Sequence, residues 1–416
     1  MIDPHKDRIR PSRRGLLSAA GGLLAASAPR AAPAVAEAPV AMEPFWGEHQ
    51  AGIVTPAQAH CYFAAFDLST VRRDDVIALL RTWTDAAARL TAGQTAVPLG
   101  TDTDASGPDS AEAAGLPPAR LTLTFGFGAG LFVKDGKDRY GLAESRPEPL
   151  IDLPRFSGDQ LVAEKTGGDL SVQACADDPQ VAFHAVRQLA RLAYDAADLR
   201  WAQTGFTSRP ADGSTPRNLM GFKDGTQTPA EVGKAVWVGE EGPAWMRGGS
   251  YLVVRRIRMA LEHWDRTNVA FQEHMVGRHK YSGAPIGLKD EFAPLGLDRN
   301  DANENPVIAE NAHVRLGNAA ANGAAEILRR GYSYNDGVNF TAERWPPWRQ
   351  GMEYDAGLVF ICYQTDPRTG FVKLFEKMAK FDMLNQYLTH TGGGLFVCPG
   401  GVRDGEFIGQ RLFGTG

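Results

Sequence analysis

Residues 218–226 (NLMGFKDGT) place one carboxylate, that of Asp224, between glycines in a segment predicted to be neither helix nor strand. Glycine lets a backbone approach a flat ligand closely or adopt a positive φ. The segment can therefore hold a flat ligand beside a carboxylate. The same pattern is typical of a turn whose aspartate caps the backbone. These residues alone leave both interpretations open.

The second candidate for chemistry is a histidine. Nine histidines are present, and none belongs to an H-E-x-x-H motif or a Glu-x-x-His pair, so zinc and di-iron sites are not supported. His313 differs from the others because it lies in the apolar and basic stretch 312–316 (AHVRL), ahead of Arg329 and Arg330. A lone histidine is usually structural, so this context makes His313 a candidate ligand and no more.

Glycines and cysteines argue against three other kinds of site. The glycines of 124–130 (TFGFGAG) lack the spacing of a dinucleotide fingerprint, and no helix is expected to follow them. No two of the four cysteines have C-x-x-C spacing, which disfavours zinc and iron–sulfur sites. Each lies in an apolar, strand-like run and is expected to be a buried free thiol, although a disulfide is not excluded. They are Cys61, Cys175, Cys362 and Cys398.

The elements that must position these residues alternate between strands and helices. The first half predicts strands at 60–68, 121–132 and 170–176, helices at 74–90 and 179–194, and a loop over 92–116. The second half predicts strands at 250–259, 330–334, 358–363 and 394–397, with helices at 261–275 and 370–380.

Two of these segments match each other. Residues 170–193 and 358–379 both run from a cysteine-bearing strand through an Asp-Pro turn into an amphipathic helix. This indicates a duplicated α+β unit, connected through residues 205–248. Crossovers of this kind favour antiparallel sheets with helices packed outside them.

The first 36 residues have the order of an export signal. A basic start is followed by small apolar residues at 15–28, and residues 34–36 (AVA) offer a cleavage site. Residues 12–17 (SRRGLL) match the twin-arginine signal, which exports folded proteins. We therefore predict a periplasmic or extracellular location, and no later segment is predicted to span a membrane.

Charge excludes one class of partner. Residues 1–36 carry six basic and two acidic residues, so their removal reduces the 44 basic and 49 acidic residues to 38 and 47, a net charge of −9. A chain this acidic is not expected to bind nucleic acid or an anionic membrane surface.

Taken together, the motifs resemble those of dye-decolourising peroxidases, in particular the exported A-type branch that includes the deferrochelatases of bacterial iron uptake. The resemblance covers nearly all of the chain after the export signal. It is carried by residues 44–53 (PFWGEHQAGI), 175–193, 218–226, 248–259, 264–266, 277–280, 283–287, 312–316 and 328–334 (LRRGYSY).

The resemblance implies the fold and the site. The family fold is a pair of ferredoxin-like units, a dimeric α+β barrel type with antiparallel sheets and peripheral helices, which agrees with the duplication. It implies halves at 37–215 and 216–416, with the haem pocket in the second. One haem b per chain is expected, with His313 as its iron ligand and Asp224 and Arg329 on the peroxide side. Further contacts to haem are implied for Gly225, Thr226, Gln227, Asn318, Arg329 and Arg315.

Three departures from the family pattern are visible. Ala319–Ala321 stand where an arginine usually meets a haem propionate, and Arg315 or Arg278 is the candidate substitute. Asn385 and Gln386 stand where acidic residues are usual. Either Asp382 orients His313 in their place or the ligand is less anionic.

The third departure is an added loop at 341–352, which contains Trp345 and Trp348. These side chains either relay electrons from bulky dyes or anchor the loop on Pro346 and Pro347. A separate question of register concerns Arg330, which follows Arg329 directly and is its rival for the peroxide side.

The resemblance implies a haem peroxidase that reduces hydrogen peroxide and oxidises bulky aromatic donors by one-electron steps. Two alternatives are a deferrochelatase, which releases iron from haem, and a non-enzymatic haem-binding protein. The expected partners are hydrogen peroxide, an aromatic or metal-linked electron donor and a redox or iron-uptake protein. The physiological reductant and the oligomeric state are left open by the sequence.

Overall fold

The computed structural model describes residues 42–414 except 103, 105, 209, 211, 230 and 343–349. The predicted export signal at 1–36 therefore lies outside the described residues, as do Trp345 and Trp348 of the added loop.

The first half of the described chain is a ferredoxin-like unit. Its main elements are β1 (His60–Leu68), α1 (Arg73–Thr91), β2 (Thr122–Phe127), β3 (Leu170–Ala176), α3 (Pro179–Leu192) and β4 (Ala197–Phe206). The strands are antiparallel and lie in the order β2-β3-β1-β4. Short helices accompany them: α2 (Ala129–Phe132), η1 (Ala143–Ser145) and η2 (Ala163–Lys165).

The second half repeats this arrangement. Its strands are β5 (Ser250–Met259), β6 (Leu328–Arg329), β7 (Tyr332–Ala342), β8 (Gln350–Gln364) and β9 (Leu388–Cys398). Its helices are α4 (Val232–Val236), η3 (Ala244–Met246), α5 (Leu261–Trp264), α6 (Val269–Val276), α7 (His313–Leu316), η4 (Ala319–Asn322), η5 (Arg368–Val372), α8 (Lys373–Phe381), η6 (Met383–Gln386) and α9 (Gln410–Phe413). The order β9-β5-β8-β7 matches that of the first half, which confirms the predicted duplication.

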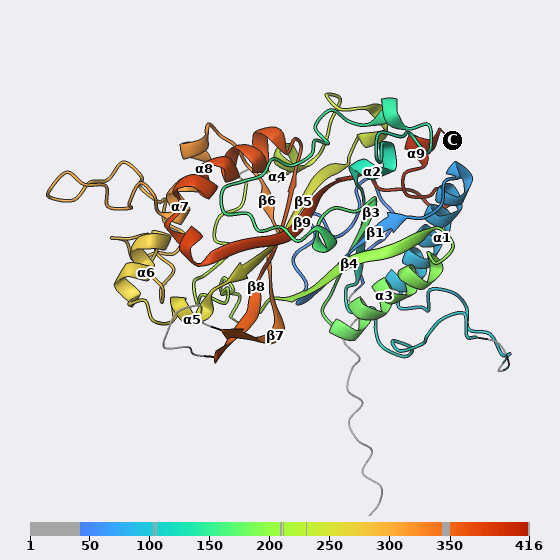
Figure 1. Ribbon diagram of the computed structural model, residues 1–416, viewed down its shortest axis with the longest axis horizontal. Coiled ribbons are helices and arrows are strands. Elements are labelled where there is room, and N and C mark those ends of the chain that lie inside the picture. Colours follow the sequence, from blue (N-terminus) through green and yellow to red (C-terminus); the bar gives the residue numbers. More distant parts are fainter. Residues whose placement is uncertain are drawn as a thin grey trace, which may run out of the picture. The chain divides into compact units, whose positions relative to one another are not determined.

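Two narrow junctions join the halves into a closed antiparallel barrel. Phe127 of β2 pairs with Val397 of β9, and Phe206 of β4 pairs with Ser333 of β7. The short strand β6 is added to β8 outside this circuit. Figure 1 shows the two sets of strands meeting between the helices of each half. The predicted fold class, duplicated ferredoxin-like units with antiparallel sheets, is confirmed.

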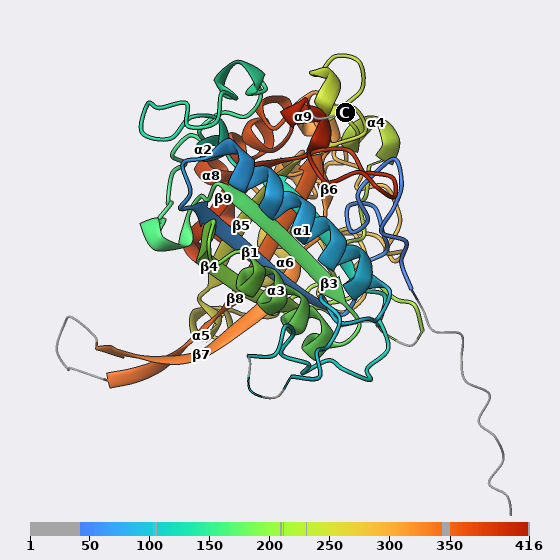
Figure 2. The ribbon, with the colours of Figure 1, turned by 90° about the vertical axis from the view of Figure 1, so that its right-hand side faces the viewer.

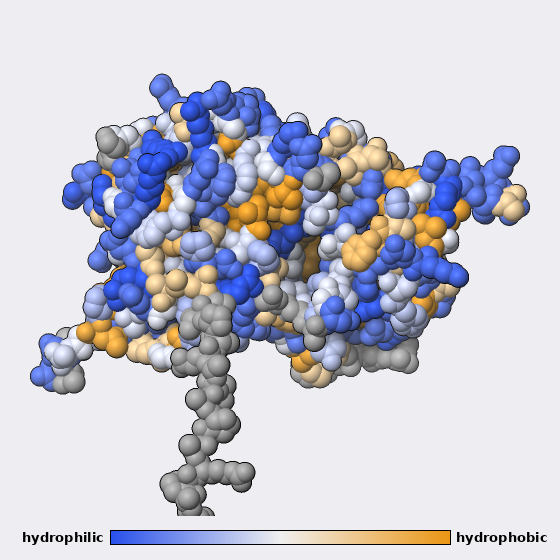
Figure 3. Space-filling model, turned by 180° about the vertical axis from the view of Figure 1, so that it is seen from behind, coloured by the Kyte–Doolittle hydropathy of each residue, from blue (hydrophilic) through white to orange (hydrophobic). Residues whose placement is uncertain are grey.

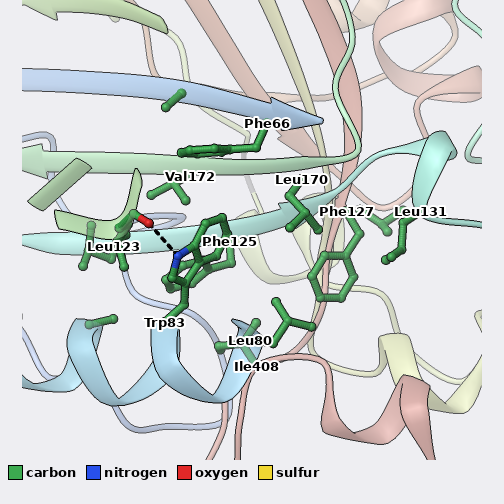
Figure 4. Packing of buried hydrophobic residues seen from close by; sticks show 14 of the residues in the cluster. Phe66, Leu80, Trp83, Leu123, Phe125, Phe127, Leu131, Leu170, Val172 and Ile408 are labelled. Carbon is green, nitrogen blue, oxygen red and sulfur yellow. Dashed lines mark hydrogen bonds between the residues drawn. The ribbon is translucent and has the colours of Figure 1, made fainter. Parts of the chain in front are cut away.

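Side-chain alternation along β1 separates an outer core from an inner one. Phe66 and its even-numbered neighbours face α1 and α3, whereas Cys61, Phe63 and Ala65 face the barrel interior. In the outer core, the ring of Trp83 packs edge-on against Phe66, and its indole Nε1 donates to the carbonyl of Leu189 at 2.8 Å (Figure 4). This contact ties α1 to α3 over the sheet.

Local signals define the second of these helices. Asp178 caps α3, accepting hydrogen bonds from the backbone N–H groups of Gln180 and Val181, and Pro179 occupies the first turn. Figure 2 shows α1 and α3 lying across the strands of the first half. The same view shows β7 and β8 extending as a hairpin away from them.

Several predicted elements need correction. The expected helix at 261–275 is two helices. The backbone of Asn268 is extended, and its side chain caps α6, so the helix stops after α5 and starts again at Val269. The expected short strand at 330–334 is instead a two-residue gap after β6, at 330–331, followed by the start of the long β7. The glycines of 124–130 are followed by one helical turn, α2, where none was expected. Strand β4 was not predicted.

Candidate active site

The loop that carries Asp224 is organised by a neighbouring asparagine. The Asn218 side-chain oxygen accepts hydrogen bonds from the backbone N–H groups of Met220 and Phe222, at 3.1 and 3.3 Å. Gly221 and Gly225 have φ values of 84° and 113°, which disfavour side chains. The segment is therefore a turn, but Asn218 rather than Asp224 caps it. The Asp224 carboxylate stays available for another partner.

That partner is Arg329, which is 105 residues away in sequence. Arg329 Nη1 donates to Asp224 Oδ1 at 3.0 Å. The two side chains are 37% and 31% exposed, so they form an accessible ion pair rather than a buried one. The strand β6 holds Arg329 opposite Cys362 of β8 and so fixes its direction.

Arg330 lies on the other side of the chain. Its side chain is buried and donates hydrogen bonds to the carbonyl of Thr55 and to Gln58 Oε1. Adjacent residues in an extended chain point in opposite directions, and here that separates the two guanidinium groups. Of the two arginines, Arg329 is the one that meets Asp224.

His313 begins the short helix α7, and a buried carboxylate orients its ring. His313 Nδ1 lies 2.6 Å from Asp382 Oδ2, and Asp382 is 5% exposed. The other oxygen of Asp382 accepts from the backbone N–H of Leu384 at 2.9 Å and caps η6. Asp382 therefore orients the His313 ring, as one of the two interpretations of the sequence had it. An acidic residue at position 385 is not needed for this role.

The contact with Asp382 determines the protonation preference of the imidazole. Burial of His313 favours the neutral ring, but the charge and hydrogen bond of Asp382 outweigh it, so the pKa of His313 is raised. Arg329 lowers and Asp224 raises this same pKa, which places the ion pair within electrostatic range of His313. In the neutral ring, a proton on Nδ1 is held by the carboxylate, which leaves the lone pair on Nε2.

A third contact brings the two loops together. Asn318 Nδ2 donates to Gln227 Oε1 at 3.4 Å, which links the segment after His313 to the segment after Asp224. Asn318 also caps η4 through a hydrogen bond from the backbone N–H of Ala320. A shared hydrophobic cluster supports both loops, and it includes Met220, Phe222, Trp264, Met275, Val314 and Leu384.

Two further predicted site residues bind neighbouring loops. Arg315 donates from Nε to the carbonyl of Ile308 and from Nη2 to that of Leu297. Thr226 donates to Glu291 Oε1 at 3.2 Å. Among the described residues, neither side chain hydrogen bonds to His313, Asp224 or Arg329.

Glu291 is a contributor that the sequence analysis missed. It joins Thr226 to Lys223, with which it forms an ion pair. The backbone carbonyl of Glu291 also accepts from Arg278 Nη1 at 2.9 Å. Glu291 follows the 283–287 stretch but lies outside every motif, so its position gave no signal.

The geometry fits a haem group. The Nε2 atom of His313 has no hydrogen-bond partner among the described residues, and the His313 side chain is 35% exposed. A neutral imidazole with a free Nε2 and a carboxylate on Nδ1 is a suitable axial ligand for haem iron. Figure 3 shows a hollow near the middle of the face opposite that of Figure 1.

Two family models cover most of the chain. The Dyp-type peroxidase N-terminal model matches residues 50–207, and the Dyp-type peroxidase C-terminal model matches residues 215–403. The chain belongs to the Dyp-type peroxidase family. It is therefore a haem peroxidase.

Curated relatives agree with this assignment. A dye-decolorizing peroxidase of Thermobifida fusca (strain YX) is 38% identical, and the match spans 99% of each chain. A deferrochelatase of Escherichia coli (strain K12) is 37% identical, over 97% of each chain.

Solved structures agree as well. The peroxidase resembles oxyferrous DtpA from Streptomyces lividans, with a TM-score of 0.80, 41% identity and coverage of 89% of this chain and 97% of that chain. A DyP-type peroxidase from Streptomyces coelicolor gives the same TM-score and coverage at 42% identity. Among the residues that the structure describes, no helix has both the length and the apolar composition needed to cross a bilayer.

The contact between His313 and Asp382 makes stability depend on pH in the haem-free protein. Because the folded pKa of His313 lies above its ordinary value of 6.5, this contact stabilises the fold fully below about pH 6.5. The stabilisation is lost as pH rises through the raised pKa. Urea unfolding over a pH series should show that Asp382→Asn costs most free energy at low pH and less at high pH.

Asn385→Ala is the control for this pH series. Asn385 lies in the same 3-10 segment but donates to the carbonyls of Met378 and Ala379, not to His313. Its stability curve should run parallel to that of the wild type. A constant difference between wild type and Asp382→Asn at every pH would show that Asp382 acts only as a helix cap.

Proposed function

We propose that His313 is the only protein ligand to haem iron and that Asp224 and Arg329 act on hydrogen peroxide at the open face. The observation that carries this proposal is the accessible Asp224–Arg329 ion pair, in electrostatic range of an imidazole whose Nδ1 is held by Asp382. The oxidised donor is a bulky aromatic compound, in line with the name of the Thermobifida fusca relative.

The two polar side chains divide the work on peroxide. Haem iron, when bound, supplies the electrons that break the O–O bond. The Asp224 carboxylate takes the proton from one peroxide oxygen and returns it to the other. The Arg329 guanidinium stays charged and stabilises the negative charge that develops on the departing oxygen. Their ion pair keeps both groups at one place before peroxide arrives.

The remaining site residues would hold the cofactor. The backbone at Gly225, where φ is 113°, and the neighbouring Thr226 and Gln227 would hold haem beside Asp224. Asn318 would contact it beside His313. Arg315 is the better candidate for a propionate than Arg278, because its Nη1 has no described hydrogen bond and Arg278 is buried with Nη1 on two carbonyls.

One optical experiment separates this function from its alternatives. The haem-loaded protein is mixed with one equivalent of hydrogen peroxide, and its absorption spectrum is followed with and without an aromatic dye. A peroxidase gives a rapid Soret change that the dye reverses while the dye is bleached. Release of iron-free porphyrin with an intact macrocycle would instead favour the activity named for the deferrochelatase relative. If neither the haem spectrum nor the dye changes, the remaining interpretation is a non-enzymatic haem-binding protein.

Removal of the proposed ligand should abolish haem binding. His313→Ala should purify with little haem, or with haem that lacks the spectrum of histidine-bound iron, because no other side chain replaces Nε2. The control is His279→Ala. His279 has a similar exposure of 37% and also places Nδ1 2.8 Å from a carboxylate, that of Glu273. A normal haem spectrum in His313→Ala would refute the ligand assignment.

Loss of either distal group should slow the reaction with peroxide. We expect Arg329→Leu to lower the rate of the Soret change by about 10²–10³ and Asp224→Asn by about 10²–10⁴. Arg258→Leu is the matched control, because the Arg258–Glu353 ion pair has similar side-chain exposures of 35% and 30%. Stopped-flow mixing measures all three rates. If the Arg258 variant slows as much as the Arg329 variant, loss of an exposed ion pair explains the effect.

We also propose that residues 1–36 are a twin-arginine export signal and that halves at 37–215 and 216–416 make up the exported protein. The order of basic start, apolar run and AVA site supports the signal. Replacing Arg13 and Arg14 together by lysine should retain the haem-loaded protein in the cytoplasm. Fractionation of the producing cells measures this, and unchanged export would refute the signal.

A further inference from the structure

A pair of cysteines faces the barrel interior. Cys61 of β1 and Cys175 of β3 are directly opposite partners in the antiparallel ladder. Both are buried, at 2% and 0% exposure, and both belong to the inner hydrophobic cluster. Opposite Cα atoms in such a ladder are about 4.5–5.5 Å apart, and disulfides span about 4.4–6.8 Å. The strands therefore need no separation for these two sulfurs to bond.

A buried positive charge lies beside this pair. Arg330 is 6% exposed and forms no ion pair with a described carboxylate. Its guanidinium donates to Thr55 and Gln58, both neutral, and lies within electrostatic range of the Cys175 sulfur. A buried charge without a counter-charge is costly. The thiolate form of Cys175 supplies the missing negative charge.

Hydrogen bonds also favour that thiolate. The Tyr332 hydroxyl donates to the Cys175 sulfur at 3.5 Å, and the Cys61 thiol lies opposite Cys175 in the ladder. Burial alone would raise the pKa of Cys175, but these neighbours and the charge of Arg330 outweigh it and lower the pKa to about 6. Cys61, in contrast, has its pKa raised by burial and by its neighbour, so it keeps its proton. These surroundings favour a thiolate at Cys175 and a thiol at Cys61.

One short segment of the chain, residues 329–332, links the surroundings of this cysteine pair to the proposed peroxide site. Arg330, which lies within electrostatic range of Cys175, is joined by one peptide bond to Arg329, which contacts Asp224. Tyr332 continues the same segment into the inner cluster, where Tyr363 donates to Gln173 at 3.0 Å. The Tyr332 hydroxyl therefore connects the Cys175 sulfur, through the backbone of residues 329–332, to the arginine that contacts Asp224.

We propose that Cys61 and Cys175 are an internal two-electron donor, which the peroxidase oxidises to a disulfide when no external donor is present. This inference rests on the proposed function. The Cys61 thiol, the Cys175 thiolate, one proton and one hydrogen peroxide become one disulfide and two waters. Each sulfur loses one electron, and each peroxide oxygen gains one. The Cys61 proton and the added proton end on the two waters.

Burial makes the reaction selective. Peroxide in solvent has no direct access to sulfurs that are 2% and 0% exposed, so the oxidising equivalents must come through the protein from the site. The other two cysteines lack the thiolate. Burial raises the pKa of Cys362 to about 12 and raises that of Cys398 as well. A thiolate is far easier to oxidise than a thiol.

The experiment uses the haem-loaded protein, reduced with dithiothreitol and then freed of it. One equivalent of hydrogen peroxide is added without a donor, the Soret band is recorded, and the protein is denatured and alkylated. We expect two of the four thiols to disappear, and the tryptic peptides of Cys61 and Cys175 to be joined. Excess dye added before peroxide should preserve all four thiols.

Variants test the route and the pairing. Arg329→Leu should slow disulfide formation by the same factor as the Soret change. Cys362→Ser and Cys398→Ser, matched buried thiols, should form the linked peptide normally, whereas Cys61→Ser should not form it. Four intact thiols in the wild type after a normal Soret change would refute this inference alone. Equal oxidation of all four cysteines, or oxidation that is unaffected in Arg329→Leu, would refute it too. Absence of the Soret change would overturn the proposed function and this inference with it.

Discussion

The alternation of side chains at the end of β6 decides where the peroxidase places two positive charges. Arg329 and Arg330 are neighbours, and the pairing of β6 with β8 fixes the direction of each. One guanidinium therefore reaches the accessible loop of Asp224, and the other enters the barrel interior. A shift of one residue in this pairing would turn Arg330 toward Asp224 and Arg329 toward the barrel interior. Neither guanidinium would then meet its present hydrogen-bond partners.

The opposite side of the site depends on a helix cap. Asp382 ends α8 and starts η6, where one oxygen accepts from the backbone N–H of Leu384 and the other faces His313. The imidazole direction is thus set by the same residue that terminates a packed helix. A carboxylate held by two contacts has little freedom to rotate, so the ring that it orients keeps its Nε2 in one direction.

Strong local signals made much of the fold predictable. The alternating pattern of β1, the Asp-Pro start of α3 and its repeat in the second half were all confirmed. Strand β4 was missed because its exposed polar positions follow a helix end without a clear turn. The break at Asn268 and the length of β7 depend on capping and on pairing with β8, which apolar periodicity does not report. Asp224, His313 and Arg329 came from motif resemblance, whereas the buried position of Arg330 required the register.

The two arginines show how surroundings assign different chemistry to one residue type. Arg329 is partly exposed, so water and a carboxylate share its charge, and the pair can open to admit a small polar substrate. Arg330 is screened from water, so a compact counter-charge beside it lowers the cost of its burial. Its hydrogen-bonded neighbours Thr55 and Gln58 are neutral, and the sulfur of Cys175 lies within electrostatic range. The requirement for charge balance in the barrel interior therefore places an oxidisable anion beside the strand that carries the proposed distal arginine.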